Sequence, residues 1–309
     1  MKIYKVRGES LEKVQNDSFK LEKDIQQLVE GNTDTLFGLE FVSSEFRVEN
    51  FRLDTLCWNP ETSSFTIIEY KKDKNFSVID QGYTYLSLML NNKAEFILEF
   101  NETQKQSLKR DDVDWSQSRV IFVAPNYTNY QKHSVNFKDV PFELWEIHKY
   151  KNDTIGLIKH ESNSDVRIES TSSGKSDSVV KSVSKEVKVY DEEYHLSKSK
   201  TRPEEIQELY LKVKERILDL GENIEVKYLA QTIQFKLEKS FVDIIIYDKG
   251  VVAIINMKKG KLDDPRKETL DMSKKGHWGN GDYKYRFKPG KELEYGIYLI
   301  KQSYEDKLK

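Results

Sequence analysis

Three charged residues in the first half of the chain have the side-chain types and the spacing that phosphodiester hydrolysis requires. Asp54 lies in the run Arg52–Trp58, and Glu69 and Lys71 lie in the run Phe65–Lys71. Side chains two residues apart on a strand point to the same face, so Glu69 and Lys71 are predicted to point the same way. Carboxylates and an amine gathered on one face can bind a cation and activate water.

The turn between the two runs decides whether Asp54 joins this pair. The intervening residues, NPETSS, are typical of a turn. A hairpin that pairs symmetrically about the Glu61–Thr62 bond puts Asp54 opposite Glu69, with Cβ atoms about 4.5–5.5 Å apart. Two carboxylates this close repel each other unless a cation lies between them, and Mg²⁺ or Mn²⁺ suits oxygen ligands. Lys71 would then orient or deprotonate the attacking water and stabilise charge on the scissile phosphate.

An ordinary set of cross-strand ion pairs on a solvated sheet face is the alternative interpretation of these residues. Against it, Phe65 and Ile67 share the predicted face with Glu69 and Lys71. A polar cluster at the end of an otherwise apolar row is more typical of a site than of a sheet rim.

Residues 52–56, RLDTL, and 67–72, IIEYKK, together resemble the D-x(n)-E-x-K signature of the PD-(D/E)XK nuclease superfamily. The resemblance covers roughly the segment 10–150 and implies a restriction-endonuclease-like α/β sandwich that cuts phosphodiester bonds with Mg²⁺ or Mn²⁺. Several branches of that superfamily place a glutamine and a tyrosine on the helix after the E-x-K strand. Gln81 and Tyr85 match these positions and, four residues apart, share a helical face.

The superfamily also often supplies a glutamate from its first helix. The apolar face of that helix is predicted at Leu21, Ile25, Leu28 and Val29. Helical geometry puts Glu22 at the flank of this face and turns Glu30 towards solvent. Glu22 is therefore predicted as a third metal ligand beside Asp54 and Glu69, and Glu40 and Glu45 on the following strand remain further candidates.

The elements that must position these residues alternate between helix and strand. Helices are predicted over residues 18–30 and 78–91 from their apolar spacing. The predicted strands are Leu39–Val48, Arg52–Trp58, Phe65–Lys71, Arg119–Ala124 and Phe142–Ile147. This order predicts an α/β sandwich.

The chain has 309 residues, which favours two domains. Residues 159–200 are rich in Ser, Lys, Asp and Glu and are predicted to be a polar linker. The nuclease-like domain would then span residues 1–158, and an α+β domain with a binding or partner role would span residues 201–309.

The second domain is predicted to begin with an amphipathic helix that starts near Pro203 and ends at Gly221. Strands at about residues 231–237, 241–248 and 251–258 follow. Because this repeats the opening order of the first domain, the second domain could be a diverged copy in which Asp243 faces Asn256 and the metal site is lost. An unrelated α+β domain is the alternative.

A local basic segment lies at residues 256–291, with eleven Lys or Arg against five Asp or Glu. Lysines contact phosphates and exposed aromatic rings stack on bases, so Tyr283, Tyr285 and Phe287 could help to hold nucleic acid. The glycines of GHWGNG could cradle an anion. The alternative is a tight turn followed by a strand whose aromatic residues face the core. The residues predicted to contact nucleic acid are Lys72, Lys258, Lys274, Lys275, His277, Trp278 and Lys284.

The remaining features exclude several classes of protein. With a net charge of −2 there is no overall basic field, and Cys57 is a single cysteine in an apolar run, expected to be buried. The five histidines are scattered, so no zinc site is expected. No signal-like or membrane-spanning apolar segment occurs, which favours a cytoplasmic protein without membrane contact.

These features predict a Mg²⁺- or Mn²⁺-dependent endonuclease, with DNA favoured over RNA only by the habit of the superfamily. The carboxyl-terminal stretch also resembles a domain of unknown function in bacterial proteins, some labelled predicted transport proteins; transport across a membrane is not supported by the sequence. A role in bacterial defence or DNA repair fits this arrangement. The rival is a non-catalytic module that binds nucleic acid or protein, and a third interpretation is a nuclease that acts within an oligomer such as a homodimer.

Overall fold

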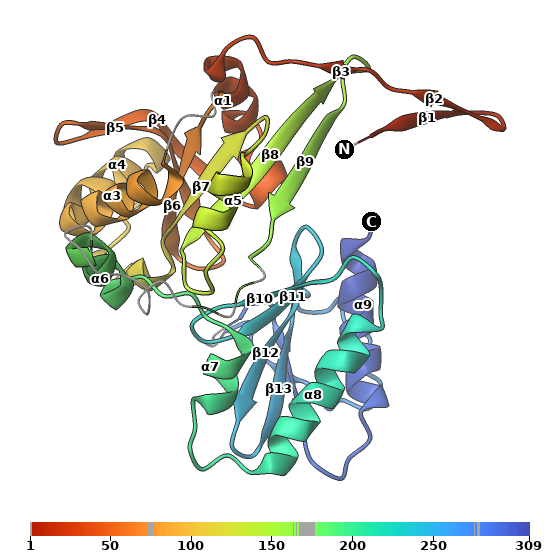
Figure 1. The fold of residues 1–309 in the computed structure, drawn as a ribbon. Coiled ribbons are helices and arrows are strands. Elements are labelled where there is room, and N and C mark those ends of the chain that lie inside the picture. Colours follow the sequence, from red (N-terminus) through yellow and green to blue (C-terminus); the bar gives the residue numbers. More distant parts are fainter. Residues whose placement is uncertain are drawn as a thin grey trace. The chain divides into compact units, whose positions relative to one another are not determined.

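The computed structural model describes residues 2–72, 77–162, 164, 166, 177–274, 276 and 279–309. The chain divides into two compact units, Met1–Val189 and Tyr190–Lys309 (Figure 1). Each unit has its own sheet, its own helices and its own hydrophobic core. We therefore describe each by itself.

Unit 1 is built on a seven-stranded mixed sheet in the described residues, in the order β3-β8-β7-β6-β5-β4 with β9 paired to β8. The neighbours β4–β5 and β5–β6 are antiparallel hairpins, whereas β6–β7 and β7–β8 are parallel. The strands are β3 (Asn16–Asp17), β4 (Glu40–Val48), β5 (Phe51–Asn59), β6 (Ser64–Tyr70), β7 (Arg119–Ala124), β8 (Phe142–Tyr150) and β9 (Ile155–His160).

Helices cover both faces of this sheet, and alternate side chains of each strand reach opposite cores. Ile68 packs with α1 and α2, and Ile67 packs with α3 and α4. Every residue of the central strand β6 is buried, as expected for a strand covered on both faces. The helices are α1 (Glu22–Glu30), α2 (Thr33–Phe37), α3 (Val78–Asn91), α4 (Lys93–Gln104) and α5 (Asn129–Ser134), with short 3₁₀ turns η1 (Arg110–Asp112) and η2 (Trp115–Gln117). The predicted α/β sandwich is confirmed.

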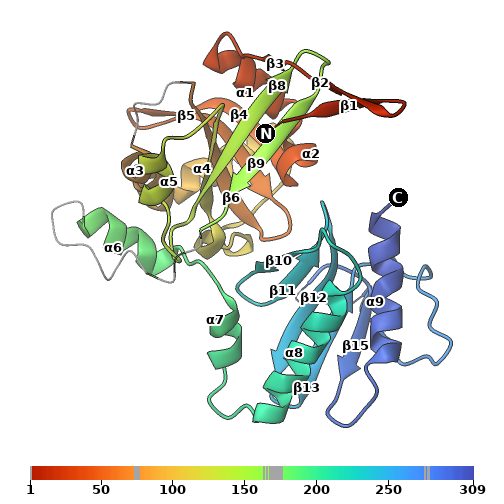
Figure 2. The ribbon, with the colours of Figure 1, turned by 45° about the vertical axis from the view of Figure 1, so that its right-hand side comes forward.

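A two-stranded ribbon, β1 (Tyr4–Arg7) and β2 (Ser10–Lys13), precedes this sheet and extends away from the body of unit 1 (Figure 2). All of its strand residues are exposed. No helix in the described part of the chain has the length and apolar content that a membrane span requires.

The segment 159–200, predicted as a linker, contains two helices in its described part, α6 (Asp177–Glu186) and α7 (Glu192–Ser197). Val180, Val183 and Val187 are buried in the core of unit 1, beside α3. Their i, i+3, i+7 spacing forms a narrow apolar stripe that the polar composition conceals. The boundary between the units therefore falls at Val189, and α7 belongs to unit 2.

Unit 2 is an α+β domain with an antiparallel six-stranded sheet in its described residues, ordered β10-β11-β12-β13-β15-β14. Helices α8 (Glu204–Leu218) and α9 (Glu294–Lys307) pack on it around a second large core. The predicted apolar stripe of α8 is confirmed, because Ile206, Leu209 and Val213 are all buried. The strands are β10 (Glu225–Tyr228), β11 (Ile233–Lys236), β12 (Ser240–Tyr247), β13 (Gly250–Ile255), β14 (Leu270–Asp271) and β15 (Tyr283–Phe287).

Unit 2 does not have the arrangement expected of a diverged copy of unit 1. Asp243 pairs with Ile254, and the main-chain amide of Asn256 bonds to the carbonyl of Phe241, so Asp243 and Asn256 do not face each other. All strand pairs of unit 2 are antiparallel, whereas unit 1 contains parallel pairs. The prediction that these two residues face each other was wrong. The β12–β13 turn at Asp248–Lys249 pairs Asp243 with Ile254, two positions before Asn256.

Candidate active site

The hairpin β5–β6 has the register that the sequence predicts. Thr55 pairs with Ile68 and Leu56 pairs with Ile67, so continuing the ladder by one residue puts Asp54 opposite Glu69. Asn59 fixes the turn, because its Oδ1 accepts hydrogen bonds from the main-chain amides of Glu61 and Thr62. A local turn therefore determines that the two carboxylates meet.

Glu69 is the buried centre of the site, with a side chain only 3% exposed. Its Oε1 is contacted by Lys71 Nζ at 2.5 Å and by Gln81 Nε2 at 2.6 Å. Its Oε2 is also buried and has no hydrogen-bond partner among the described residues. One oxygen of this carboxylate is thus neutralised, while the other is a buried acceptor without a donor, an arrangement that costs free energy.

Helix α3 brings two further predicted residues to Glu69. The helix begins after Ser77, whose Oγ accepts the amide of Asp80 at 3.3 Å and caps it. One turn later, Gln81 Nε2 also donates to the Tyr85 hydroxyl at 2.8 Å, so Gln81 and Tyr85 share a face as predicted. Burial, and then the Glu69 carboxylate, raise the pKa of Tyr85, which keeps its hydroxyl protonated.

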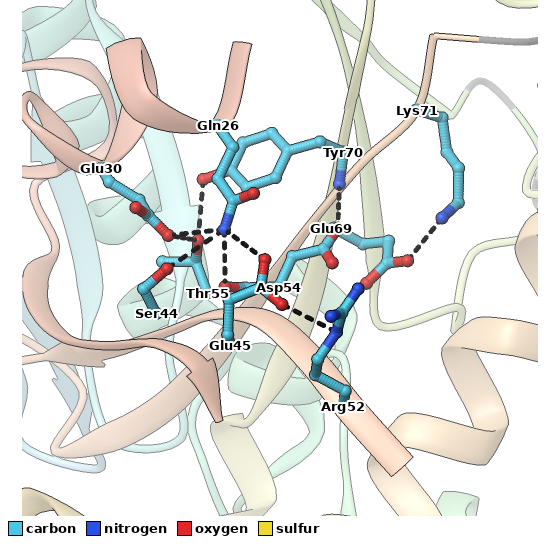
Figure 3. A network of polar contacts seen from close by, with 10 residues as sticks. All are labelled: Gln26, Glu30, Ser44, Glu45, Arg52, Asp54, Thr55, Glu69, Tyr70 and Lys71. Carbon is cyan, nitrogen blue, oxygen red and sulfur yellow. Dashed lines mark hydrogen bonds and ion pairs between the residues drawn. The ribbon is translucent and has the colours of Figure 1, made fainter. Parts of the chain in front are cut away.

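Asp54 lies on β5 one residue beyond the β5–β6 ladder, with Glu69 and Arg52 nearby (Figure 3). Its Oδ2 accepts the main-chain amide of Tyr70 at 3.0 Å, which fixes the carboxylate beside Glu69. Burial raises the pKa of Asp54 to about 7, the Glu69 carboxylate adds to the rise, and Lys71 opposes it. The charged form of Asp54 is therefore disfavoured, first by burial and then by the neighbouring Glu69 carboxylate.

Gln26 of α1 supports Asp54 by a hydrogen bond to its main-chain oxygen. This residue was not identified from the sequence. Its Nε2 lies 3.1 Å from the main-chain oxygen of Asp54 and 3.0 Å from Glu30 Oε1, with Ser44 and Glu45 also in contact (Figure 3). These bonds tie the first helix to the strand that carries Asp54. The sequence signal for it is weak, because it consists only of a polar residue between Ile25 and Val29 on the apolar face of the helix.

The prediction that Glu30 faces solvent was wrong. Glu30 Oε1 accepts the hydroxyl of Thr55 at 2.7 Å, and Thr55 in turn contacts the hydroxyl of Tyr70 at 3.1 Å. The buried face of α1 is centred on Ile25, Gln26 and Val29 rather than on Leu21, which is exposed. This rotation brings Glu30 to the flank of the face.

Glu22 lies in the first turn of α1 and is exposed. Its Oε2 accepts the main-chain amide of Lys72 at 2.8 Å, and Lys72 Nζ donates to the main-chain oxygen of Lys20. Glu22 therefore holds the segment that follows β6. Among the residues that the structure describes, no three His, Cys, Asp or Glu side chains converge as a metal-ligand set.

Asp54 and Glu69 nevertheless fit a divalent cation. Both offer hard carboxylate oxygens, and the buried Glu69 Oε2 is an acceptor without a donor in the described part of the chain. A cation would also offset the repulsion between the two carboxylates, which adds to the effect of burial on the pKa of Asp54. Mg²⁺ is commonly bound by one or two carboxylates together with water and substrate phosphates, so two protein ligands suffice.

A second polar cluster, centred on Glu146 of β8, was not predicted from the sequence. Glu146 contacts Lys132 Nζ at 3.0 Å, His160 Nε2 at 2.9 Å and His148 Nε2 at 3.2 Å. Lys132 and His160 contribute to a lowered pKa of Glu146 against the effect of burial. Two histidines that are 12 positions apart in the sequence meet because β8 and β9 form a hairpin.

The predicted nucleic-acid segment of unit 2 looks different in the structure. Lys275, His277 and Trp278 lie outside the described residues. Lys258 and Lys274 are exposed and Lys284 is half-buried, and Lys72 of unit 1 is exposed.

Tyr285 and Phe287 of this segment face the core instead of solvent. Tyr285 and Phe287 are 5% and 2% exposed, so they cannot stack on bases. Gly281 allows close packing, because a Cβ there would lie 2.1 Å from the main-chain oxygen of Ile255. The alternative of a turn and a strand with core-facing rings is the one that the structure bears out.

Cys57 is buried beneath α1 and α2, as predicted. Burial raises the pKa of its thiol. A thiol in this environment is a packing residue rather than a nucleophile.

Comparison with known proteins gives a full-length relative. A protein of Haemophilus influenzae (strain ATCC 51907 / DSM 11121 / KW20 / Rd), described as an uncharacterized protein, is 46% identical over 307 residues, covering 99% of this chain and 100% of the relative. A sequence-family model described as "Domain of unknown function (DUF5655)" matches residues 193–307, most of unit 2.

Two solved structures resemble part of the chain. One is a repair endonuclease from Pyrococcus abyssi, with 17% identity and a TM-score of 0.23 over 38% of this chain and 44% of that chain. The other is a complex of EndoMS with dsDNA, with 13% identity and a TM-score of 0.22 over 44% of this chain and 60% of that chain. The matched parts are less than two thirds of either structure, and similarities of this size do not establish a shared activity.

Proposed function

The chain belongs to the family of the Haemophilus influenzae protein, and for this chain we propose a divalent-cation-dependent nuclease, of the PD-(D/E)XK kind, that hydrolyses phosphodiester bonds. The observation that carries the proposal is Glu69. Its Oε1 is held by Lys71 and Gln81, its buried Oε2 has no donor among the described residues, and Asp54 lies opposite on the neighbouring strand. DNA is the expected substrate.

Asp54 and Glu69 would hold Mg²⁺ or Mn²⁺ with their carboxylate oxygens. Such an ion, when bound, stabilises negative charge on the phosphate and lowers the pKa of a coordinated water. Lys71 stands at Glu69 Oε1, where its ammonium can orient the attacking water and offset charge on the phosphate oxygens.

The other residues keep this geometry in place. Gln81 fixes the Glu69 carboxylate by its amide and is held in turn by Tyr85. The Tyr70 amide and Gln26 fix the side chain and the main chain of Asp54. Supporting hydrogen bonds of this kind commonly change metal affinity or activity by about 10–100-fold.

The experiment that tests the proposal is cleavage of single-stranded DNA, duplex DNA, plasmid and RNA in Mn²⁺, Mg²⁺ and EDTA. We expect wild type to cut at least one substrate in Mn²⁺ or Mg²⁺ and none in EDTA. We expect Glu69→Ala to lose at least about 100-fold of the rate, because it removes a metal ligand. Glu102→Ala, an exposed glutamate of α4, is the matched control and should cut like wild type.

Two outcomes would count against the proposal. Cutting that survives in EDTA or in Glu69→Ala would mean that the chemistry lies elsewhere. Binding of nucleic acid in chelator without cutting in either metal would favour the non-catalytic binding module.

A further inference from the structure

Two arginines face each other near the tip of the β4–β5 hairpin. Arg47 and Arg52 are a directly opposed cross-strand pair. Arg47 is exposed, and the Arg52 side chain is 59% exposed. Like charges in this position destabilise an antiparallel pair, so the arrangement needs an explanation other than the stability of the hairpin.

The acids nearby compensate only part of this charge. Glu45 Oε2 forms an ion pair with Arg52 Nε at 2.7 Å. No acidic side chain pairs with Arg47 within the described ranges of the chain. At least one positive charge of the pair is therefore left for an external anion.

The pair also lies beside the candidate active site. Arg52 precedes Asp54 by two residues on β5, which corresponds to about 7 Å along an extended strand. The ladder pairs Ser44 with Thr55 and Phe46 with Leu53, so Glu45 lies opposite Asp54. Glu45 has a left-handed backbone with φ 55°, an unusual conformation for a glutamate, and from it the side chain reaches Arg52.

We propose that Arg47 and Arg52 form a clamp for a phosphate group of the nucleic-acid strand that enters the Asp54–Glu69 site. The proposal rests on the proposed function, because it takes the substrate to be a nucleic acid. Each guanidinium presents a planar set of donors that matches two phosphate oxygens, and a phosphate between them removes their mutual repulsion. A contact of this kind positions the backbone and does not depend on sequence.

The test is nucleic-acid binding by the full chain in EDTA, where the proposed cleavage cannot occur. Affinity for a labelled DNA duplex, and for an RNA duplex alongside, is measured against salt concentration for wild type, Arg47→Ala, Arg52→Ala and the double variant. Because both arginines contact the same phosphate, the double variant should lower the slope of log affinity against log salt by about 0.9, and each single variant should lower it by part of that amount. Arg110→Ala, an exposed arginine of η1, is the control and should keep the wild-type slope.

The thermal midpoint separates a binding role from a structural one. Because Arg47→Ala removes a repulsion, its Tm should equal or exceed that of wild type. Unchanged salt slopes in the double variant, no binding by wild type, or a loss of binding that comes with a lowered Tm in Arg47→Ala would each overturn the clamp.

The clamp and the nuclease can fail separately. Arginine-dependent binding in EDTA without cutting in Mn²⁺ would support the clamp and contradict the nuclease. If the protein cut nucleic acid in Mn²⁺ but the arginine variants bound it like wild type, the nuclease would be supported and the clamp contradicted.

Discussion

At the scale of single residues, the site depends on how the two oxygens of one carboxylate differ. Lys71 and Gln81 both contact Glu69 Oε1, which leaves Oε2 as a buried acceptor without a donor among the described residues. Asp54 beside it has a pKa raised to about 7, chiefly by burial. The sequence predicted that these two carboxylates lie opposite each other, which the register confirms, and a cation between them stays a prediction.

The sequence could not predict the residues that support Asp54. Gln26 is a polar residue within an apolar face, and its identity alone does not show whether it points at solvent, at a helix neighbour or at a strand. Glu30 was misplaced for the same reason, since the rotation of α1 depends on tertiary packing against β5 and β6.

Gln26 gives a prediction at this scale. Gln26→Leu removes the Nε2 donor to the main-chain oxygen of Asp54 and one of the two donors to Glu30 Oε1, so the variant should require more Mn²⁺ for half-maximal cleavage, by about 10–100-fold. Gln27→Leu, the exposed neighbour on the same helix, is the control and should behave as wild type. The metal concentration for half-maximal rate is measured well below the Tm of each variant, and a wild-type value in Gln26→Leu would show that Gln26 does not position Asp54.

At the scale of elements, the central strands of unit 1 were predictable because their runs are rich in β-branched and aromatic residues. The hairpin register followed from the turn after Asn59, and helix α3 has the predicted bounds. Helix α4 was not predicted, because only Phe96 and Phe100 of its residues are fully buried and the rest show no clear stripe. Helix α6 was not predicted, because it lies in a polar segment in which only three valines at helical spacing are buried in the core.

Helix α7 gives a pH prediction. The Nε2 of its buried His195 donates to Leu229 O over 2.8 Å, and burial lowers the pKa of His195 to about 4. An unfolded histidine takes up its proton near pH 6.5, so the contribution of neutral His195 to stability is complete above pH 6.5 and is lost as the pH falls from 6.5 towards 4. At pH 5 the loss amounts to about 2 kcal/mol.

The variant His195→Gln tests this, because its amide can reach the same carbonyl but does not titrate. Urea unfolding at pH 7.5 and pH 5, read by hydrogen exchange in peptides from unit 2, should show a smaller loss of stability in the variant than in wild type. Equal losses would mean that His195 titrates normally in the folded chain.

At the scale of the whole molecule, the candidate chemistry belongs to unit 1 alone. Asp54, Glu69, Lys71, Gln81 and Gln26 all lie within Met1–Val189. The DUF5655 match lies within unit 2, which has its own core, and Tyr283, Tyr285 and Phe287 are part of that core or pack against it. The sequence left both interpretations open, because alternating aromatic residues among lysines are typical both of a stacking surface and of an amphipathic strand.

The most direct test of the proposed cation site is calorimetric titration of the full chain with Mn²⁺, without any substrate. We predict that wild type binds Mn²⁺ and that Asp54→Asn and Glu69→Gln each weaken binding by about tenfold or more, because each removes a charged oxygen ligand. Glu102→Gln should bind like wild type. If wild type took up no Mn²⁺, or if both site variants bound it as tightly as wild type, the Asp54–Glu69 pair would not be a cation site and the proposed nuclease would lose its basis.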